Sequence, residues 1–227
     1  MIRQYFLQPM KICMLCMLSL SFFMASNAYA EQIFGYVGFR MNSFGGLPRW
    51  ERVLSRLEQE GELFKLCDEN IDYCSSPALA GWRDFMSEQQ GLTRLQQVKA
   101  VNKFVNRWPY ITDDQLWGLS DYWATPMEFL EHSGDCEDYS ILKYISLREL
   151  GVPAEDLRIL VVRDVVRDIA HAILGVRVDG KWMILDSLFT AVLGHDKMLQ
   201  YTPYYAVNEE SRWTYIPPLR SGKRKFR

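Results

Sequence analysis

The sequence predicts an α+β fold in which helices come first, one central helix packs on an antiparallel sheet, and strands come last. Three observations support this. Apolar residues repeat at helical spacing from about residue 47 to 150, three strand-like segments follow, and Asp179-Gly180 joins the last two as a hairpin loop. No repeat, low-complexity tract or linker interrupts the pattern. We therefore expect a single domain.

Residues 1–30 have the pattern of a secretory signal peptide. "MIRQYFLQPMK" carries two positive and no negative side chains, and "ASNAYA" ends in an Ala-x-Ala cleavage signal. The apolar run "ICMLCMLSLSFFM" is shorter than the ~20 residues of a spanning helix. We expect cleavage after Ala30 and an exported domain, residues 31–227, with no stable membrane insertion. An uncleaved anchor is the alternative.

The charge balance excludes nucleic acid as an expected partner. Removing Arg3 and Lys11 with the leader leaves 26 − 2 = 24 basic against 28 acidic side chains, a net charge of −4 with histidines neutral. Nucleic-acid binding depends on a positive surface. The basic tail "RSGKRKFR" is typical of a solvated C-terminus, with an anion-docking patch as the alternative.

Three cysteines remain after the leader: Cys67, Cys74 and Cys136. An odd number in an exported protein indicates one disulfide and one free thiol. Cys67 and Cys74 are the natural pair because they are close together in "LCDENIDYC". Cys136 then stays unpaired, which is typical of a thiol that is either buried or functional.

The helical part contains two apolar stripes and a helix beginning near Pro77. The stripes consist of Trp50, Val53, Leu54 and Leu57, and of Leu95, Val98, Val101, Val105 and Trp108. Next, "TPMEFLEHSG" contains a capping box and ends at Gly134. A central helix follows, which begins near Cys136 and stops at Gly151. The sulfur therefore lies at a helix N-terminus.

Strands are expected at 157–163, 171–178 and 181–186. The two-residue loop pairs Val178 with Lys181, which makes His171 the diagonal neighbour of Asp186 on the same face, with Cα atoms ~7–8 Å apart. If the central helix packs across this face, Cys136, His171 and Asp186 supply a nucleophile, a base and an orienting carboxylate. The alternative is three unrelated residues: a buried cysteine, a strand histidine and a strand-end aspartate.

The strings "GDCEDYS", "HAILGV" and "WMILDS" resemble the transglutaminase-like cysteine proteases, and most closely the LapG-type periplasmic proteases of bacteria. The resemblance implies a transglutaminase-like or papain-like fold. It also implies Cys136 as nucleophile, His171 as general base and then acid, and Asp186 as orienting carboxylate. The compartment it implies is the periplasm.

The resemblance further implies calcium bound beside the cysteine by Asp135, Glu137 and Asp138. Three carboxylates in four residues repel one another unless a cation neutralises them, and hard oxygen ligands favour calcium. The alternative is that the acidic residues favour the helix N-terminus. "DENIDYC" fails as an EF-hand because Tyr73 stands where glycine is required, and no second Cys/His pair accompanies His132 to make a zinc site.

An acyl-transfer site also needs an oxyanion hole. The Cys136 backbone N–H and the Trp123 indole N–H are candidates, although Trp123 also fits a core position. Members of the resembling family cut large repeat adhesins at a di-alanine site near the adhesin N-terminus and so disperse biofilm. Their activity is controlled by the periplasmic domain of an inner-membrane cyclic-di-GMP receptor. Two alternatives remain: a transglutaminase-type acyltransferase and a non-catalytic calcium-responsive binding protein.

Overall fold

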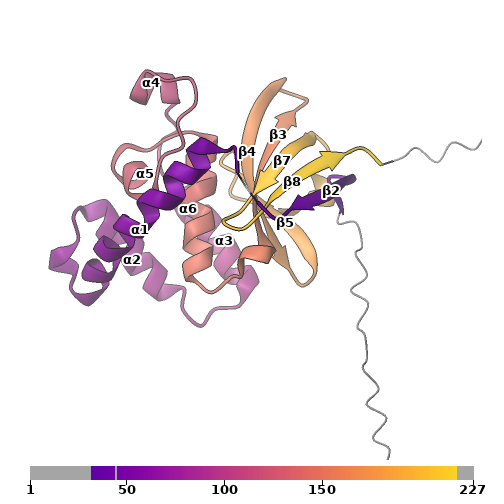
Figure 1. The fold of residues 1–227 in the computed structure, drawn as a ribbon. Helices are drawn as coiled ribbons and strands as arrows, with labels where there is room; N and C mark the ends of the chain where they lie inside the picture. The colour runs from indigo at the N-terminus through magenta and orange to yellow at the C-terminus, as the bar shows by residue number, and fades with distance from the viewer. Residues whose placement is uncertain (1–31, 44, 219–227) are drawn as a thin grey trace, which may run out of the picture.

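The computed structural model describes residues 32–43 and 45–218 (Figure 1). Helices occupy one side of the molecule and an antiparallel sheet occupies the other, as the sequence predicts. The predicted signal peptide, residues 1–30, and the basic tail, residues 220–227, lie outside the described residues. None of the helices in the described ranges is long and apolar enough to cross a membrane.

Six α-helices lie between residues 48 and 149 of the described chain: α1 (Pro48–Glu69), α2 (Pro77–Glu88), α3 (Arg94–Val105), α4 (Asp113–Trp117), α5 (Pro126–His132) and α6 (Cys136–Glu149). Their starts follow local chemistry. Pro48, Pro77 and Pro126 open α1, α2 and α5, because a proline at the first turn removes an N–H that has no helical partner. Thr93 and Thr125 form capping boxes at α3 and α5.

The eight strands described form one sheet in the order β1-β2-β8-β7-β3-β4-β5-β6. Their bounds are β1 (Gln32–Ile33), β2 (Tyr36–Met41), β3 (Leu157–Asp164), β4 (Ile169–Val178), β5 (Lys181–Leu185), β6 (Leu193–Gly194), β7 (Tyr201–Val207) and β8 (Arg212–Ile216). The predicted hairpin has the expected register, with Val178 opposite Lys181. Asp179 and Gly180 both have positive φ, as a tight hairpin turn requires.

The sequence reading missed five strands, among them β1 and β2, which precede the helices and pair with the C-terminal β8. β7 contains Pro203, which cannot donate to a ladder, and the pairing of β7 with β3 shifts register between Val161 and Val162, opposite this proline. The layout is therefore not simply helices followed by strands, because β2, which precedes the helices, pairs with β8, the last strand.

α6 is the central element of the fold. All ten of its residues from Asp138 to Leu147 are buried, between the other helices and one face of the sheet. Leu174 and Val176 of β4 belong to the same apolar cluster as Leu142 of α6. Ile173 belongs to a second cluster on the opposite face of the sheet. A helix buried on all sides fixes the position of its first residue, Cys136.

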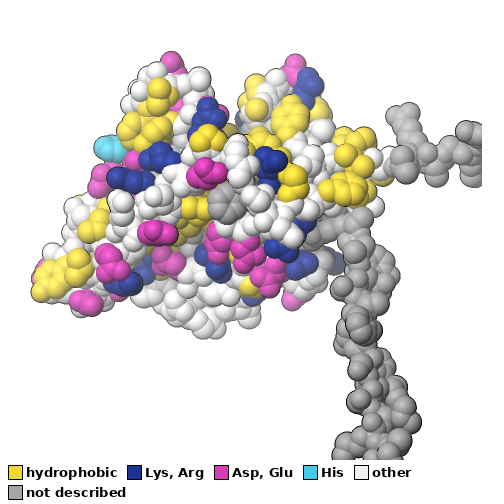
Figure 2. Space-filling model, viewed as in Figure 1, with side chains coloured by type: hydrophobic (Ala, Val, Ile, Leu, Met, Phe, Trp, Pro, Cys, Tyr) yellow, Lys and Arg dark blue, Asp and Glu magenta, His cyan; other side chains and the backbone are white. Residues whose placement is uncertain are grey.

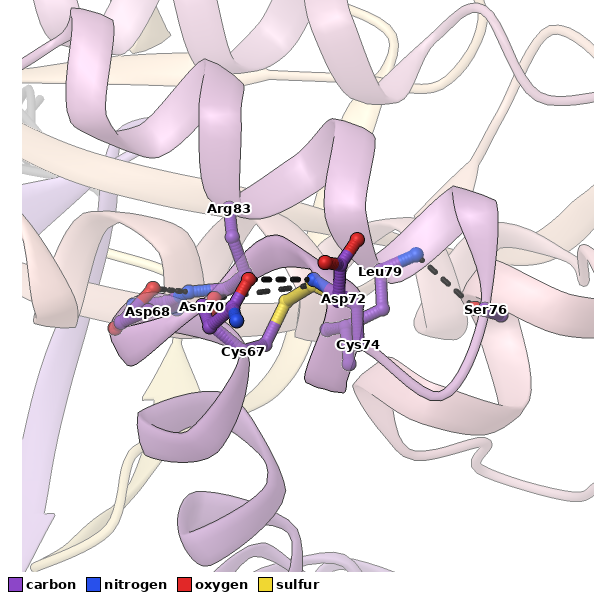
Figure 3. The surroundings of a disulfide bond; sticks show 8 residues. All are labelled: Cys67, Asp68, Asn70, Asp72, Cys74, Ser76, Leu79 and Arg83. Carbon is purple, nitrogen blue, oxygen red and sulfur yellow. Dashed lines mark hydrogen bonds and ion pairs between the residues drawn. A yellow bond between two sulfur atoms is a disulfide. The ribbon is translucent and has the colours of Figure 1, made fainter.

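Cys67 at the end of α1 is joined by a disulfide to Cys74, with the Cα atoms 4.4 Å apart (Figure 3). The loop between them does not form a cation site of the EF-hand kind. Asp68 is paired with Arg83 of α2, with Oδ2 2.6 Å from the guanidinium, and the side chain of Asn70 accepts the Asp72 N–H. The Asp68 and Asn70 side chains are thus engaged with protein groups. Cys136 is the free cysteine of the described residues.

Candidate active site

A cavity of about 310 Å³ opens at the N-terminus of α6. Tyr110 and Trp123, from the segment around α4, line this cavity, as do Ala170 and His171 of β4. Cys136 lines the same cavity. In Figure 1 the α4 segment and the β3–β4 hairpin project from the same end of the molecule, and Figure 2 shows the surface notched between the two projections.

Cys136 is held at the helix start by Asp138. Both carboxylate oxygens of Asp138 accept backbone N–H groups, from Ala124 at 2.6 Å and from Asp135 at 3.0 Å. Gly134 is needed here because a Cβ at that position would lie 2.1 Å from Asp138 Oδ2. The glycine before the cysteine therefore makes room for the carboxylate that fixes the helix start.

The Cys136 thiol donates a hydrogen bond to Glu137 Oε2 over 3.1 Å. Burial raises the pKa of this thiol well above its ordinary value, and the Glu137 and Asp135 carboxylates raise it further. The backbone N–H of Ala172 acts in the opposite direction. With this carboxylate arrangement, the chain by itself favours the neutral thiol over the thiolate.

His171 and Asp186 form a buried pair, with His171 Nε2 2.9 Å from Asp186 Oδ1. The contact follows from the hairpin register. Because Nε2 faces Asp186, the imidazole has Nδ1 available for another partner. Asp186 also accepts the Leu188 N–H at Oδ1 over 3.0 Å and the Tyr201 hydroxyl at Oδ2. The side-chain amide of Asn106, the residue that follows α3, donates to the Asp186 backbone carbonyl over 2.8 Å.

The ionised form of Asp186 is stabilised by these donors. Burial alone would raise its pKa, but hydrogen bonds from His171, Tyr201 and the Leu188 amide lower it below the ordinary value. Lys143 of α6 is fully buried and interacts electrostatically with Asp186. Burial lowers the pKa of Lys143 to about 7, and the Asp186 charge opposes that shift.

The relation of α6 to this pair differs from the expected one. Side chains alternate along β4, so Leu174 and Val176 pack with α6, whereas the face that carries His171 and Ile173 continues into the second cluster, which includes Tyr201. The helix does not pack across the face of the His–Asp pair. Instead, Cys136 and His171 line one cavity. His171 lies in the part of β4 that precedes Leu174, where pairing with β5 begins.

The acidic residues form a larger group than the sequence indicated. Ligand atoms of Asp113, Asp135 and Asp138 lie within 4.8 Å of one another, and so do those of Asp113, Asp121 and Glu137. Asp113 begins α4 and is buried. Burial raises the pKa of Asp113 to about 6, and the Asp135 charge adds to this shift. Burial likewise raises the pKa of Glu137 to about 10.

Two oxygens in this acidic group lack a partner. Oδ1 of Asp113 and Oδ1 of Asp135 are buried without a hydrogen bond among the described residues. Arg49 brings a positive charge to the group through its ion pair with Asp121 over 3.2 Å. Asp113 and Asp121 were missed in the sequence because their short segment has no strong pattern. The "TDD" helix start at Asp113 was the available signal.

Trp123 lines the cavity, as an oxyanion donor would, and is buried, as a core residue would be. Its indole N–H donates to Asp121 Oδ1 over 3.1 Å. The indole therefore already has an acceptor within the acidic group. Tyr110 and Tyr205 also line the cavity. Burial raises the pKa of Tyr110, and the neighbouring Cys136 raises it further.

In this α+β fold an unpaired cysteine begins the central helix, and a buried histidine and carboxylate lie at the same cavity. This is the arrangement of the transglutaminase-like thiol enzymes. A family model described as bacterial transglutaminase-like cysteine proteinase BTLCP matches residues 59–220. The chain belongs to this family of cysteine proteinases.

Solved structures of Legionella pneumophila LapG are similar to this chain. One is 30% identical, covers 68% of this chain and 86% of its own, and has a TM-score of 0.58. A calcium-bound form is 33% identical over 60% of this chain and 77% of its own, with a TM-score of 0.56. An EGTA-treated form is 30% identical over 68% and 84%, with a TM-score of 0.58. No curated protein sequence matches the chain.

Proposed function

We propose that this protein is a calcium-dependent periplasmic cysteine endopeptidase with Cys136 as nucleophile, His171 as acid and base, and Asp186 as orienting carboxylate. The observation that carries the proposal is that Cys136 and His171 line one cavity while His171 Nε2 is bound to Asp186. Family membership supports the proteinase class.

The residues have defined roles in this reaction. His171 Nδ1 takes the thiol proton, and the Cys136 sulfur attacks a peptide carbonyl carbon. His171 then returns that proton to the leaving amine, which breaks the C–N bond and leaves a thioester. Finally, His171 removes a proton from water, and the hydroxide that results attacks the thioester carbon. The C–S bond breaks to release the acid product, and His171 returns the proton to the sulfur. Asp186 keeps the imidazole oriented throughout.

The oxyanion of each tetrahedral intermediate needs hydrogen-bond donors. The Cys136 backbone N–H at the first turn of α6 is free of a helical acceptor by its position. Trp123 serves as the second donor in this proposal. Its indole N–H must then exchange its bond to Asp121 for one to the oxyanion.

Calcium fits the acidic group beside Cys136. Asp135 and Asp113 have buried oxygens without partners, and Glu137, Asp138 and Asp121 add hard oxygen donors. We assign Asp135, Glu137 and Asp138 as ligands, with Asp113 and Asp121 as additions from the structure. A bound cation supplies positive charge that offsets the carboxylates that now raise the thiol pKa. The calcium-bound LapG structure supports calcium as the cation.

The substrate and control proposed here come from the resemblance to LapG. The substrate is the N-terminal region of a large repeat adhesin with a di-alanine site, and its cleavage releases the adhesin and disperses biofilm. The proposed regulator is the periplasmic domain of an inner-membrane cyclic-di-GMP receptor. The leader predicted from the sequence supports the periplasm as the proposed compartment.

The test is to incubate purified residues 31–227 with the N-terminal segment of a large repeat adhesin from the same organism, with calcium or with EGTA. We expect a single cut that requires calcium. Cys136→Ala should abolish this cut, and circular dichroism should show that the variant is folded. An added amine acceptor distinguishes hydrolysis from acyl transfer. Cross-linked product without hydrolysis would refute the protease assignment, and cleavage by Cys136→Ala would refute the nucleophile.

A further inference from the structure

Tyr201 is a buried residue that the proposed reaction does not use. It is the first residue of β7, pairs with Asp164 of β3, and has 3% of its surface exposed. Its side chain lies in the cluster on the sheet face opposite α6. From this side its hydroxyl donates to Asp186 Oδ2. Tyr201 therefore reaches the His–Asp pair from a different element than either member.

The two oxygens of Asp186 have different donors. Oδ1 accepts from His171 Nε2 and from the Leu188 N–H, whereas Oδ2 accepts from Tyr201. Among the described residues, no second donor to Oδ2 is found. Because Asp186 is fully buried, loss of the Tyr201 bond would leave Oδ2 without the water that compensates an exposed carboxylate.

The Tyr201 ring is itself held in place. The Phe34 ring, in the turn between β1 and β2, meets it edge-on with centroids 5.8 Å apart, and the His171 ring lies 5.9 Å away at 39°. The Phe34 backbone N–H donates to His195 Nδ1 over 3.0 Å, which anchors the turn. The phenol thus has little freedom to turn away from Asp186.

We propose that Tyr201 is a positioning residue: its hydroxyl holds the Asp186 carboxylate in the orientation in which Oδ1 faces His171 Nε2. The proposal rests on the proposed function, because it assumes that Asp186 orients the catalytic imidazole. It adds a fourth residue to that machinery, one that acts through Asp186 and does not touch the substrate.

The sign of the effect on pH dependence follows from the groups around Asp186. Four titratable side chains interact with it: His171 from β4, Tyr201 from β7, Lys143 from α6, and Arg167 from the β3–β4 turn. The Tyr201 hydrogen bond is one of the interactions that lower the Asp186 pKa against the effect of burial. Tyr201→Phe removes this bond and leaves the other three groups, so the Asp186 pKa rises.

The experiment compares Tyr201→Phe with the wild type at saturating calcium. We expect kcat to fall roughly tenfold with KM unchanged, the size of one hydrogen bond to a charged group. The acid limb of the kcat profile should move to higher pH, and the NMR signal of the His171 Nε2 proton should shift. The matched control is Tyr144→Phe, which removes a buried hydroxyl bonded to Glu209 over 2.8 Å, and which should change none of the three.

A structural role alone would lower the number of active molecules without moving the acid limb. Unchanged kcat per active site, or an acid limb at the wild-type position, would overturn the proposal. If Tyr201→Phe does not fold, Phe34→Leu carries the test: it keeps the hydroxyl and loosens the ring, so a smaller shift in the same direction is expected, and no shift counts against Tyr201. The NMR readout needs no turnover, so it stays informative even if Cys136→Ala disproves the nucleophile.

Discussion

The buried carboxylate Asp186 and the acidic group at the start of α6 differ in how the chain satisfies their oxygens. Asp186 has donors at both oxygens, and these donors lower its pKa. Asp113 and Asp135 each keep a buried oxygen without a partner, and burial raises the pKa of Asp113 to about 6. The chain completes the first site with its own groups, whereas the second site is suited to a cation that the chain does not supply.

An active thiol therefore has two separate requirements: an oriented imidazole and a suitable charge around the sulfur. The imidazole is oriented by folding alone, because β4, β5 and β7 bring His171, Asp186 and Tyr201 together. Folding alone does not provide the charge that a thiolate needs, because the thiol donates to Glu137 and has a raised pKa. Loss of calcium and loss of the Asp186 charge should therefore inactivate the enzyme in distinguishable ways.

The largest effect is expected from Asp186→Asn. This change leaves the shape of the site but replaces the carboxylate that orients His171, and activity should fall roughly 10³–10⁴-fold, the scale seen when a catalytic histidine loses its orienting carboxylate. Excess calcium should not restore it. The measurement is kcat/KM against calcium concentration, and recovery at high calcium would show that the two sites are not independent.

Asp113→Asn should give a smaller loss, and one that calcium reverses. The substitution removes one charged oxygen donor from the acidic group and keeps the side-chain size, so the calcium concentration for half-maximal activity should rise roughly 10–100-fold. The maximal rate should approach that of the wild type. Asp114→Asn, the next residue of α4 and outside the acidic group, is the matched control. An unchanged calcium requirement in Asp113→Asn would remove Asp113 from the site.

The smallest effect is a pH dependence of stability without calcium. The folded-state pKa of Asp113, about 6, lies above its ordinary value of 3.8, so its ionisation disfavours the folded state above pH 6. As pH falls from about 6 towards 3.8, this penalty disappears. Thermal unfolding in EGTA should therefore occur at a higher temperature at pH 5 than at pH 7, with a smaller gain in Asp113→Asn. Equal gains in both proteins would assign the effect to other carboxylates.

The sequence predicts the His–Asp pair better than the acidic group for a physical reason. Asp179-Gly180 sets a hairpin register, and the register places His171 beside Asp186 through local backbone geometry. Asp113 and Asp121 reach Asp135 only through tertiary packing of the α4 segment, which has no periodic pattern. Tyr201 was not predicted because Pro203, two residues further on, argues against a strand in the sequence.

The turn at Phe34 has a practical consequence for how the enzyme is produced. Phe34 stands four residues after Ala30, the predicted cleavage site, and its ring braces Tyr201 behind the His–Asp pair. A recombinant version that starts beyond residue 34 would retain every residue assigned to catalysis or calcium binding and still lack this brace. The choice of the first residue, and of any tag placed before it, thus becomes a variable to control when specific activities from different preparations are compared.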